Sequence, residues 1–222
     1  MNNRIFAIAI DGPASSGKST VAKALSKTLD ILYVDTGAMY RAVAYFCINK
    51  GIKTTDEAAV NSVLDEINMD IKVIDGTQHI ILNGEDVSGK IRNQEVGQGA
   101  SDVAVFFEVR ERLVEIQRDI AKNQSVVMDG RDIGTNVLKD AEYKIYLTAS
   151  LEERAARRHA EYIAAGSTDT LEEVKAQLAA RDENDMGRKH NPLKKADDAL
   201  EIDSTNLTIE EVERKILDYI RK

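Results

Sequence analysis

Apolar and polar residues along the chain follow two different periods in turn. Short unbroken apolar runs are typical of strands buried on both faces of a parallel sheet. Segments with apolar residues three or four positions apart predict the helices between these strands. The strands are expected at residues 5–10, 31–34, 125–128, 143–147 and 199–202. Strands that alternate with helices predict an α/β fold, with a parallel sheet of about five strands and helices on both faces.

The predicted helices often begin with a capping signal. Ser or Thr followed three residues later by Glu occurs at Ser150, Thr170 and Thr208, each time before an amphipathic segment. The helices are expected at residues 21–29, 39–48, 55–67, 94–122, 151–165, 171–181 and 209–220. Within residues 94–122, Gly97 and Gly99 are expected to break the beginning of the helix.

Residues 71–87 have a different character. Ile71–Ile74 and His79–Leu82 are β-type runs separated by Asp75-Gly76, and Asn83-Gly84 follows. Asp-Gly and Asn-Gly pairs between such runs are strong hairpin signals. We therefore predict a small antiparallel insert, attached as an appendage to the α/β chain.

The segment between the first predicted strand and helix fits a phosphate-binding loop. Gly12 and Gly17 enclose four free positions, and Lys18 and a hydroxyl residue follow. Glycine lets the backbone approach a polyphosphate, Lys18 adds positive charge, and the Ser19 hydroxyl can bind Mg²⁺. The expected ATP-binding residues here are Gly12, Pro13, Ala14, Ser15, Ser16, Gly17, Lys18, Ser19 and Thr20. This loop alone fits an ATPase, a GTPase or many kinases.

Composition narrows the class of protein. The 222 residues are 43% hydrophobic, enough for one sizeable core, and carry a net charge of −8. An acidic chain lacks the basic face that nucleic-acid polymers and membranes usually attract, so neither partner is expected. The single cysteine, Cys47, lies in an apolar stretch and is expected in the core. The N-terminus does not resemble a signal peptide, so we expect a cytoplasmic protein.

Charged clusters follow the later strands. An acid at the end of a strand beside a phosphate loop can hold Mg²⁺ directly or through water, and Asp129 is our candidate, with Asp35 second. Arg154 and Arg158 share a helix face, where like charges repel unless an anion joins them. The charged stretch 181–188 fits either a segment that closes over a nucleotide or a helix end with surface ion pairs. No Asn-Lys-x-Asp segment is present, which argues against a regulatory GTPase.

From Ile8 onward the chain closely resembles the bacterial cytidylate kinases, which phosphorylate CMP and dCMP. Asp35-Thr36-Gly37-Ala38-Met39-Tyr40-Arg41 and Gly130-Arg131-Asp132-Ile133-Gly134-Thr135 are the most specific motifs, far more so than the phosphate loop. The other matching segments are 10–13, 84–88, 91–92, 100–101, 109–110 and 202–205.

The resemblance implies a role for each matching position. Arg41 and Arg131 are expected at the acceptor phosphate with Thr36, and Ser101, Arg110 and Asp132 at the cytosine. Arg181 and Asp185 match sugar contacts and Arg188 another nucleotide contact, which favours a functional stretch 181–188. The lid would follow Ser150, with Arg154, Arg157 and Arg158 at ATP. The expected catalytic residues are Lys18, Arg131, Asp129 and Arg158, and the expected metal ligands are Ser19 and Asp129.

The predicted reaction is transfer of the γ-phosphoryl group of ATP, bound with Mg²⁺, to CMP or dCMP. Kinases for UMP, AMP or a shikimate-like acceptor are alternatives, and a non-catalytic nucleotide switch is a weaker one. We expect a monomer with one kinase domain over residues 1–222. Its core would span about 1–35, 105–150 and 190–222, its monophosphate-binding insert about 36–104, and its helical lid about 151–189.

Overall fold

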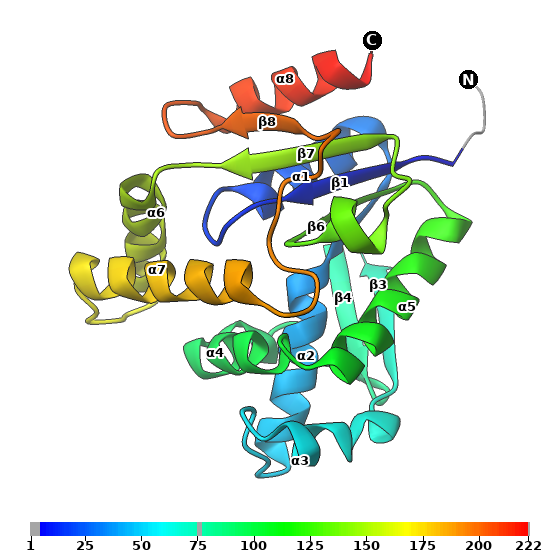
Figure 1. The fold of residues 1–222 in the computed structure, drawn as a ribbon, viewed down its shortest axis with the longest axis vertical. Coiled ribbons are helices and arrows are strands. Elements are labelled where there is room, and N and C mark those ends of the chain that lie inside the picture. The colour runs from blue at the N-terminus through cyan, green and yellow to red at the C-terminus, as the bar shows by residue number, and fades with distance from the viewer. Residues whose placement is uncertain (1–4, 75–76, 222) are drawn as a thin grey trace. The chain divides into compact units, whose positions relative to one another are not determined.

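A computed structural model describes residues 5–74 and 77–221 (Figure 1). The chain forms two compact units. The first consists of Met1–Leu32 and Gln124–Lys222, and the second of Tyr33–Asn123. The expected division of a single kinase domain into core, insert and lid stays a prediction.

A five-stranded parallel sheet, in the order β2-β6-β1-β7-β8, organises the chain. Its strands are β1 (Ala7–Asp11), β2 (Leu32–Asp35), β6 (Val126–Gly130), β7 (Tyr143–Thr148) and β8 (Leu200–Asp203). Each lies within two residues of a predicted strand, which confirms the α/β fold. Ile8, Ile10 and Met128 have no exposed surface, as expected of central strands covered on both faces. The strand β2 leads from the first unit into the second.

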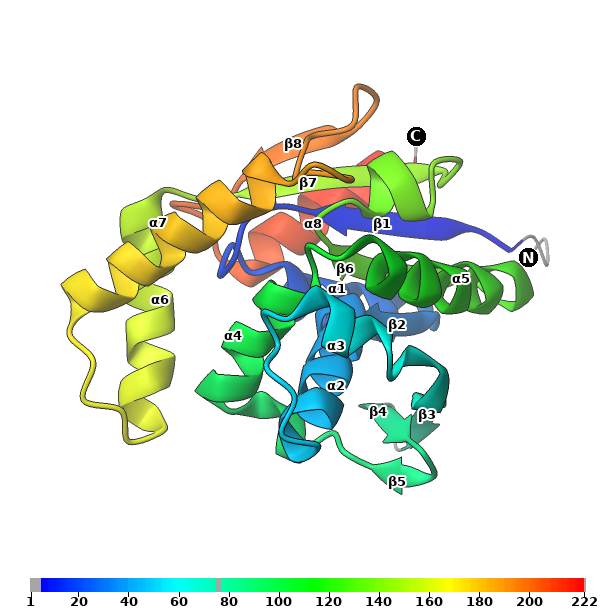
Figure 2. The same ribbon diagram turned by 60° about the horizontal axis from the view of Figure 1, so that its bottom comes forward.

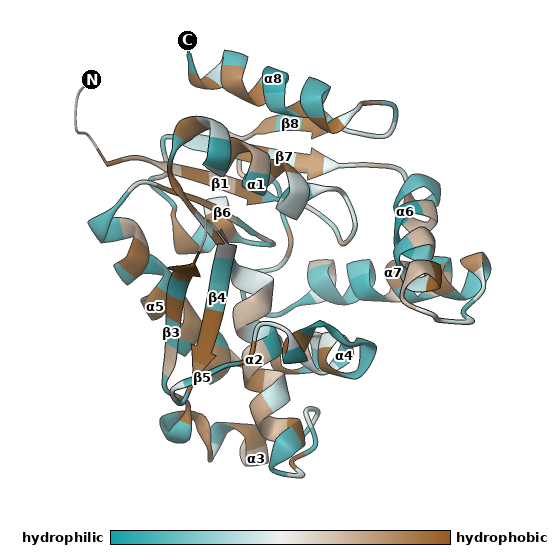
Figure 3. Ribbon diagram, turned by 180° about the vertical axis from the view of Figure 1, so that it is seen from behind, coloured by the Kyte–Doolittle hydropathy of each residue, from teal (hydrophilic) through white to brown (hydrophobic). Residues whose placement is uncertain are grey.

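Two helices of the first unit pack against each other beside this sheet. They are α1 (Lys18–Leu29) and α8 (Ile209–Ile220), and the Thr28 hydroxyl donates a hydrogen bond to Glu213 (2.6 Å). The Thr208 side chain caps α8 in a complete capping box, as predicted. Apolar and polar residues alternate along α8 in Figure 3, and its apolar residues Val212 and Ile216 are buried.

The remaining long helices of the first unit form a pair at the carboxyl end of β7 (Figures 1 and 2). They are α6 (Leu151–Ala164) and α7 (Leu171–Gly187). Ser150 caps α6 through its bond from the Glu153 amide (3.2 Å), but the Glu153 carboxylate pairs with Arg157, so no reciprocal box is recorded there. Thr170 and Glu173 form the complete box at α7, which continues past the predicted end at residue 181.

The second unit combines helices with a small antiparallel sheet in the order β3-β4-β5. Its strands are β3 (Met69–Ile74), β4 (Thr77–Leu82) and β5 (Glu85–Asp86), and its helices are α2 (Thr36–Asn49), α3 (Glu57–Asn61), α4 (Gln94–Val103) and α5 (Phe107–Asn123). Pairing of β3 with β4 confirms the hairpin, whose predicted turn Asp75-Gly76 lies outside the described residues. Ile80 and Leu82 are buried, so the hairpin contributes to the core of this unit and is more than an appendage.

Three local predictions were wrong. The helix expected at 55–67 is split into α3 and a 3-10 helix, Leu64–Glu66. The helix expected at 94–122 breaks at residues 104–106, where the Arg110 guanidinium donates to the carbonyl oxygen of Ala104 (3.1 Å) and satisfies a helix-end acceptor. Gly97 and Gly99 lie inside α4 without breaking it. A π-helix at Ile133–Val137 and a 3-10 helix at Lys90–Arg92 had no sequence signal.

The two glycines of α4 provide a matched test of helix packing. A Cβ atom on Gly99 would lie 2.9 Å from Thr54 Cγ2 and 3.1 Å from the Ala44 Cβ of α2, whereas one on Gly97 would meet nothing within 4 Å. We expect Gly99→Ala to lower the free energy of unfolding by about 1–2 kcal/mol because of overpacking. Gly97→Ala should raise it by up to about 1 kcal/mol through helix propensity. Urea denaturation of both variants measures this, and equal effects would contradict the packing argument.

Candidate active site

The phosphate loop depends on a very close approach between two backbones. A Cβ atom on Gly12 (φ +151°) would lie 2.0 Å from the carbonyl oxygen of Leu147 on the neighbouring strand β7. Gly17 is the N-cap of α1 with a φ of +92°, a conformation that side chains disfavour. Both glycines of the motif are therefore required by geometry. They place the N-terminus of α1, where unpaired amides and the helix dipole favour an anion, directly after the loop.

Lys18 lies buried within this loop. Its Nζ donates to the carbonyl oxygen of Pro13 (2.5 Å) and to the Ser16 hydroxyl (3.3 Å). Burial and, next, the charge of Arg131 hold the pKa of Lys18 well below its usual range, against the attraction of Asp129 and nearby carboxylates. The ammonium group thus folds back on the loop that it would leave to reach a phosphate.

Ser19 and Asp129 meet beside the loop, as predicted. The Ser19 hydroxyl donates to Asp129 Oδ2 at 2.8 Å, and Asp129 is 5% exposed at the end of β6. Two oxygen ligands of the type that Mg²⁺ prefers are therefore adjacent. Among residues 5–74 and 77–221, no group of three or more His, Cys, Asp or Glu side chains could hold a metal ion.

Asp11, at the end of β1, connects the phosphate loop to the segment after β6. Its two carboxylate oxygens accept hydrogen bonds from the amides of Ile133 (2.7 Å) and Gly134 (2.8 Å), at the beginning of the π-helix. Burial raises the pKa of Asp11 to about 7, although these two bonds act in the opposite direction. Asp132, which precedes the π-helix, accepts a bond from Asn136 Nδ2 (3.0 Å). Asp11 thereby fixes the segment that directly follows Arg131 and Asp132.

Arg131 points to α7, where it meets a carboxylate between two arginines. Its Nε donates to Asp185 Oδ2 at 2.6 Å, and Arg188 pairs with the other oxygen of Asp185. Burial would raise the pKa of Asp185, but the charges of Arg131, Arg188 and Arg181 hold it below its usual range. The structure thus brings together four of the residues predicted at CMP, and the stretch 181–188 is helical up to Gly187.

The three arginines of α6 each lie close to the phosphate loop or its support. Arg154 donates to the Ala14 carbonyl oxygen (3.3 Å) and Arg158 to the Ser15 hydroxyl (3.0 Å). Arg157 donates to the carbonyl oxygen of Ser204 (2.9 Å), whose hydroxyl donates to the carbonyl oxygen of Ser16 (3.2 Å). In the structure each arginine of the Arg154 and Arg158 pair has its own carboxylate, Asp182 for Arg154 (2.5 Å) and Glu161 for Arg158 (3.0 Å), and a shared phosphate stays a prediction.

The other predicted CMP residues lie in the second unit. Thr36 is the buried first residue of α2. Asp35 caps this helix, accepting from the Ala38 amide (2.9 Å), and pairs with Arg41 (3.0 Å). The backbone of Asp35 is held by Gln78 of β4, whose Oε1 accepts from the Asp35 amide (2.6 Å). The inserted hairpin therefore fixes the turn before Arg41, and Asp35 has a capping role that needs no metal.

Arg110 belongs to the core of the second unit. It is 2% exposed, and its guanidinium carbon lies 5.8 Å from the centre of the Tyr40 ring. Ser101 is half-buried on α4. The predicted site residues therefore form two groups, one in each unit.

Two residues of the site were given no role by sequence reasoning. Asp11 carried a usable signal, because a carboxylate that ends a buried apolar run needs hydrogen-bond partners. Asp182 carried none, because its partner Arg154 is 28 residues away on another helix.

Cys47 is buried, as predicted. In the described part of the chain, no helix is long and apolar enough to cross a membrane.

The high pKa of Asp11 predicts how stability depends on pH. The folded protein keeps the Asp11 proton up to about pH 7, whereas an unfolded aspartate loses it near pH 3.8, so Asp11 lowers stability as pH rises between these values. Asp11→Asn removes this titration. Between pH 5 and pH 8, the unfolding free energy of the wild type should fall by roughly 2–3 kcal/mol more than that of the variant. Urea titrations at both pH values measure the difference, and parallel pH dependences would contradict it.

Known proteins resemble the chain along its whole length. The cytidylate kinase family profile matches residues 8–222. Cytidylate kinase from Caldicellulosiruptor saccharolyticus is 51% identical over 215 residues, covering 97% of this chain and 95% of that protein. Cytidylate kinase from Geobacillus is 51% identical over 222 residues, covering 100% and 99%.

Solved structures at low identity share the fold. A gluconokinase from Sinorhizobium meliloti matches with a TM-score of 0.50 at 14% identity, covering 98% of this chain and 94% of that one. An uncharacterised protein from Eubacterium ventriosum matches with a TM-score of 0.54 at 14% identity, covering 98% and 99%. Because the family profile spans residues 8–222 and about half of all residues are identical to those of full-length relatives, the chain belongs to the cytidylate kinase family.

Proposed function

We propose that this enzyme transfers the γ-phosphoryl group of ATP to CMP or dCMP, giving ADP and CDP or dCDP. The observation that carries the proposal is the direct connection between the phosphate loop and the Asp129–Thr135 motif. Asp129 bonds to Ser19, and Asp11, next to Gly12, binds the amides of Ile133 and Gly134. The motif that we propose for the acceptor is thus hydrogen-bonded to the loop that we propose for the donor. Relatives named cytidylate kinase, half identical over their length, support the choice of acceptor.

The donor side consists of Lys18, the loop amides and the arginines of α6. In the proposed mechanism Lys18 leaves the Pro13 carbonyl oxygen for the β and γ phosphates. Arg158 donates from Nε to the Ser15 hydroxyl of the loop. Its guanidinium would stay in contact with the phosphoryl group during transfer. No covalent intermediate is needed, because positioning and charge stabilisation suffice for phosphoryl transfer.

Magnesium fits the pair formed by Ser19 and Asp129. Mg²⁺ favours oxygen ligands, keeps several waters and takes further ligands from substrate phosphates, so two protein oxygens are enough. When bound, the ion neutralises charge on the β and γ phosphates. Asp129 would hold it directly or through water, and the Ser19 hydroxyl would exchange its bond to Asp129 for the ion.

The acceptor side needs guanidinium groups that bind the phosphate and polar side chains that recognise the base. Arg41 and Arg131 would neutralise the acceptor phosphate with help from Thr36, since guanidinium matches phosphate oxygens in pairs. Ser101, Arg110 and Asp132 would read the cytosine, and Arg181, Asp185 and Arg188 the sugar and remaining groups. Closure of α6 and α7 would exclude water that otherwise hydrolyses ATP. We further propose that the enzyme acts as a cytoplasmic monomer.

A panel of acceptors tests the proposed reaction. In a coupled assay with ATP and Mg²⁺, CMP and dCMP should be phosphorylated at least tenfold faster than UMP or AMP at equal concentration.

The Arg131→Ala variant should have about 10²–10³-fold lower turnover, because it loses a guanidinium group that would stabilise the negative charge of the transferring phosphoryl group. Its melting temperature should change little, since Asp185 keeps Arg188. The control is Arg214→Ala, an exposed arginine of α8. Unchanged turnover in Arg131→Ala would refute the assignment.

Titration with Mg²⁺ tests the metal site. Ser19→Ala and Asp129→Asn each remove one proposed ligand, so the Mg²⁺ concentration for half-maximal rate should rise about tenfold, and excess Mg²⁺ should recover part of the rate. Ser26→Ala is the matched control, because the hydroxyl of Ser26 on the same helix donates to the Ile31 carbonyl oxygen (2.6 Å). A wild-type Mg²⁺ dependence in both ligand variants would exclude this site.

A further inference from the structure

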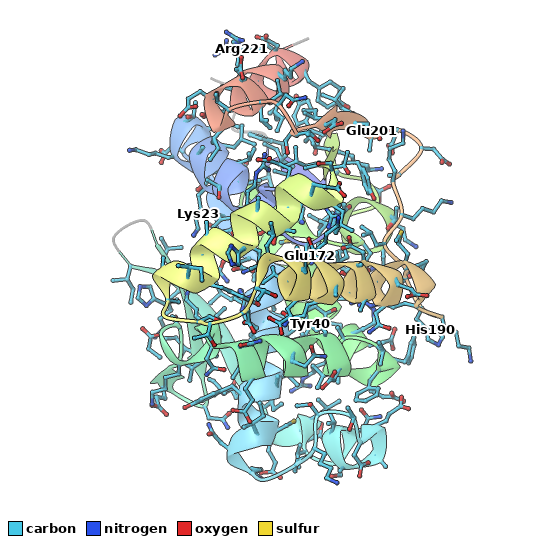
Figure 4. All side chains as sticks on the ribbon, turned by 90° about the vertical axis from the view of Figure 1, so that its left-hand side faces the viewer. Lys23, Tyr40, Glu172, His190, Glu201 and Arg221 are labelled. Atoms are coloured by element: carbon cyan, nitrogen blue, oxygen red, sulfur yellow. The ribbon has the colours of Figure 1, made fainter. Side chains whose placement is uncertain are left out.

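Asp182 is a buried carboxylate that accepts a hydrogen bond from an arginine. It lies on α7, and its Oδ2 accepts from Arg154 Nη1 of α6 at 2.5 Å. The two side chains are 9% and 8% exposed. The second carboxylate oxygen, Oδ1, is buried without a hydrogen-bond partner. Figure 4 shows α7 along its length, from Glu172 in the first turn to His190 beyond the last.

Arg154 connects three parts of the first unit. Its Nε donates to the Ala149 carbonyl oxygen just after β7 (3.0 Å), and its Nη1 donates to both Asp182 and the Ala14 carbonyl oxygen of the phosphate loop. The Ala14 side chain also packs in an apolar cluster with residues of both helices, namely Ala155, Val174 and Leu178. One guanidinium thus connects the phosphate loop to α7, which carries Arg181 and Asp185 and is followed by Arg188.

This ion pair is a poor source of stability. Burying two charges costs much of what their attraction returns, and an unpartnered carboxylate oxygen adds a further desolvation cost. Asp182 instead limits the conformations of a long side chain that has many rotamers when unrestrained. The geometry of Arg154 over the loop is what the pair provides.

We propose that Asp182 is a positioning residue for ATP, which acts by holding the Arg154 guanidinium over the phosphate loop. The proposal rests on the proposed function, in which this loop binds the phosphates of ATP. When phosphates enter, Arg154 exchanges the Ala14 carbonyl oxygen for a phosphate oxygen. A second N–H of the same guanidinium then reaches the free Oδ1 of Asp182, giving a two-point pairing. Asp182 is thereby satisfied in the loaded state.

A second ion pair between the same helices provides a matched control. Glu152 of α6 and Lys175 of α7 lie 2.9 Å apart, and their side chains are 71% and 34% exposed. Glu152→Gln, like Asp182→Asn, removes a carboxylate that pairs with a cation on the other helix. The cation here is Lys175, which is not in the phosphate loop. It separates the attachment of α6 to α7 from the positioning of Arg154.

The experiment measures ATP binding apart from catalysis. Calorimetry with a non-hydrolysable ATP analogue and Mg²⁺ should show about tenfold weaker binding for Asp182→Asn and unchanged binding for Glu152→Gln. In steady-state assays the KM for ATP should rise about tenfold, and the KM for CMP should stay within twofold. Because Asp182 acts through Arg154, the double variant Arg154→Gln/Asp182→Asn should bind the analogue no more weakly than Arg154→Gln alone.

Several outcomes would overturn the proposal. One is wild-type ATP affinity in folded Asp182→Asn, and another is additive losses in the double variant. Equal weakening of ATP and CMP, together with a lower melting temperature, would assign Asp182 a merely structural role. If Asp182→Asn does not fold, Asp182→Glu keeps the charge. Its displaced carboxylate should still lower the affinity for the ATP analogue severalfold. Failure of the wild type to phosphorylate CMP would refute the proposed function but leave the calorimetric test of Asp182 intact.

Discussion

Buried cations beside the phosphate loop are balanced by buried carboxylates. Lys18, Arg131 and Arg154 are all close to this loop or to the turn after β6, and leaving one of them unpaired in a protein interior would be costly. The balancing carboxylates are Asp129, Asp185 and Asp182. The arrangement of α7 follows from this requirement, because two of the three carboxylates lie on its inner face.

In the proposed function, ligand binding at this site is an exchange of hydrogen-bond and ion-pair partners. Phosphate oxygens compete with carboxylates already in place, so much of the electrostatic attraction is spent in releasing existing pairs. What the pairs provide is order, since each guanidinium is already held within reach of the loop. The same logic explains why Lys18 rests on the Pro13 carbonyl oxygen. An acceptor of the wrong shape gains charge pairing but leaves released carboxylates without partners, which favours discrimination.

The elements that the sequence predicted correctly are those that depend on residues close together along the chain. The apolar runs, the glycines of the loop and the capping boxes at Thr170 and Thr208 each reflect a constraint within a few residues. The break between α4 and α5 depends on a bond from Arg110 to Ala104, and the π-helix depends on the distant Asp11. Neither has a periodic signature. The Asp182–Arg154 pair and the hold of Gln78 on Asp35 were invisible for the same reason, since the fold alone brings their partners together.

The second unit, Tyr33–Asn123, leaves and rejoins the first at adjacent positions. The amide of Leu32 donates to the carbonyl oxygen of Ser125 at 3.1 Å, so the two ends of the segment 33–124 are joined in the first unit. The first three residues of this unit complete β2, and the segment after β2 can be lengthened, shortened or replaced with little disturbance of the host sheet. Thr36, Arg41, Ser101 and Arg110 all belong to it. The four residues proposed for the acceptor in this unit could therefore change when this segment is exchanged, whereas Arg131, Asp132 and Asp185 of the first unit would be inherited unchanged.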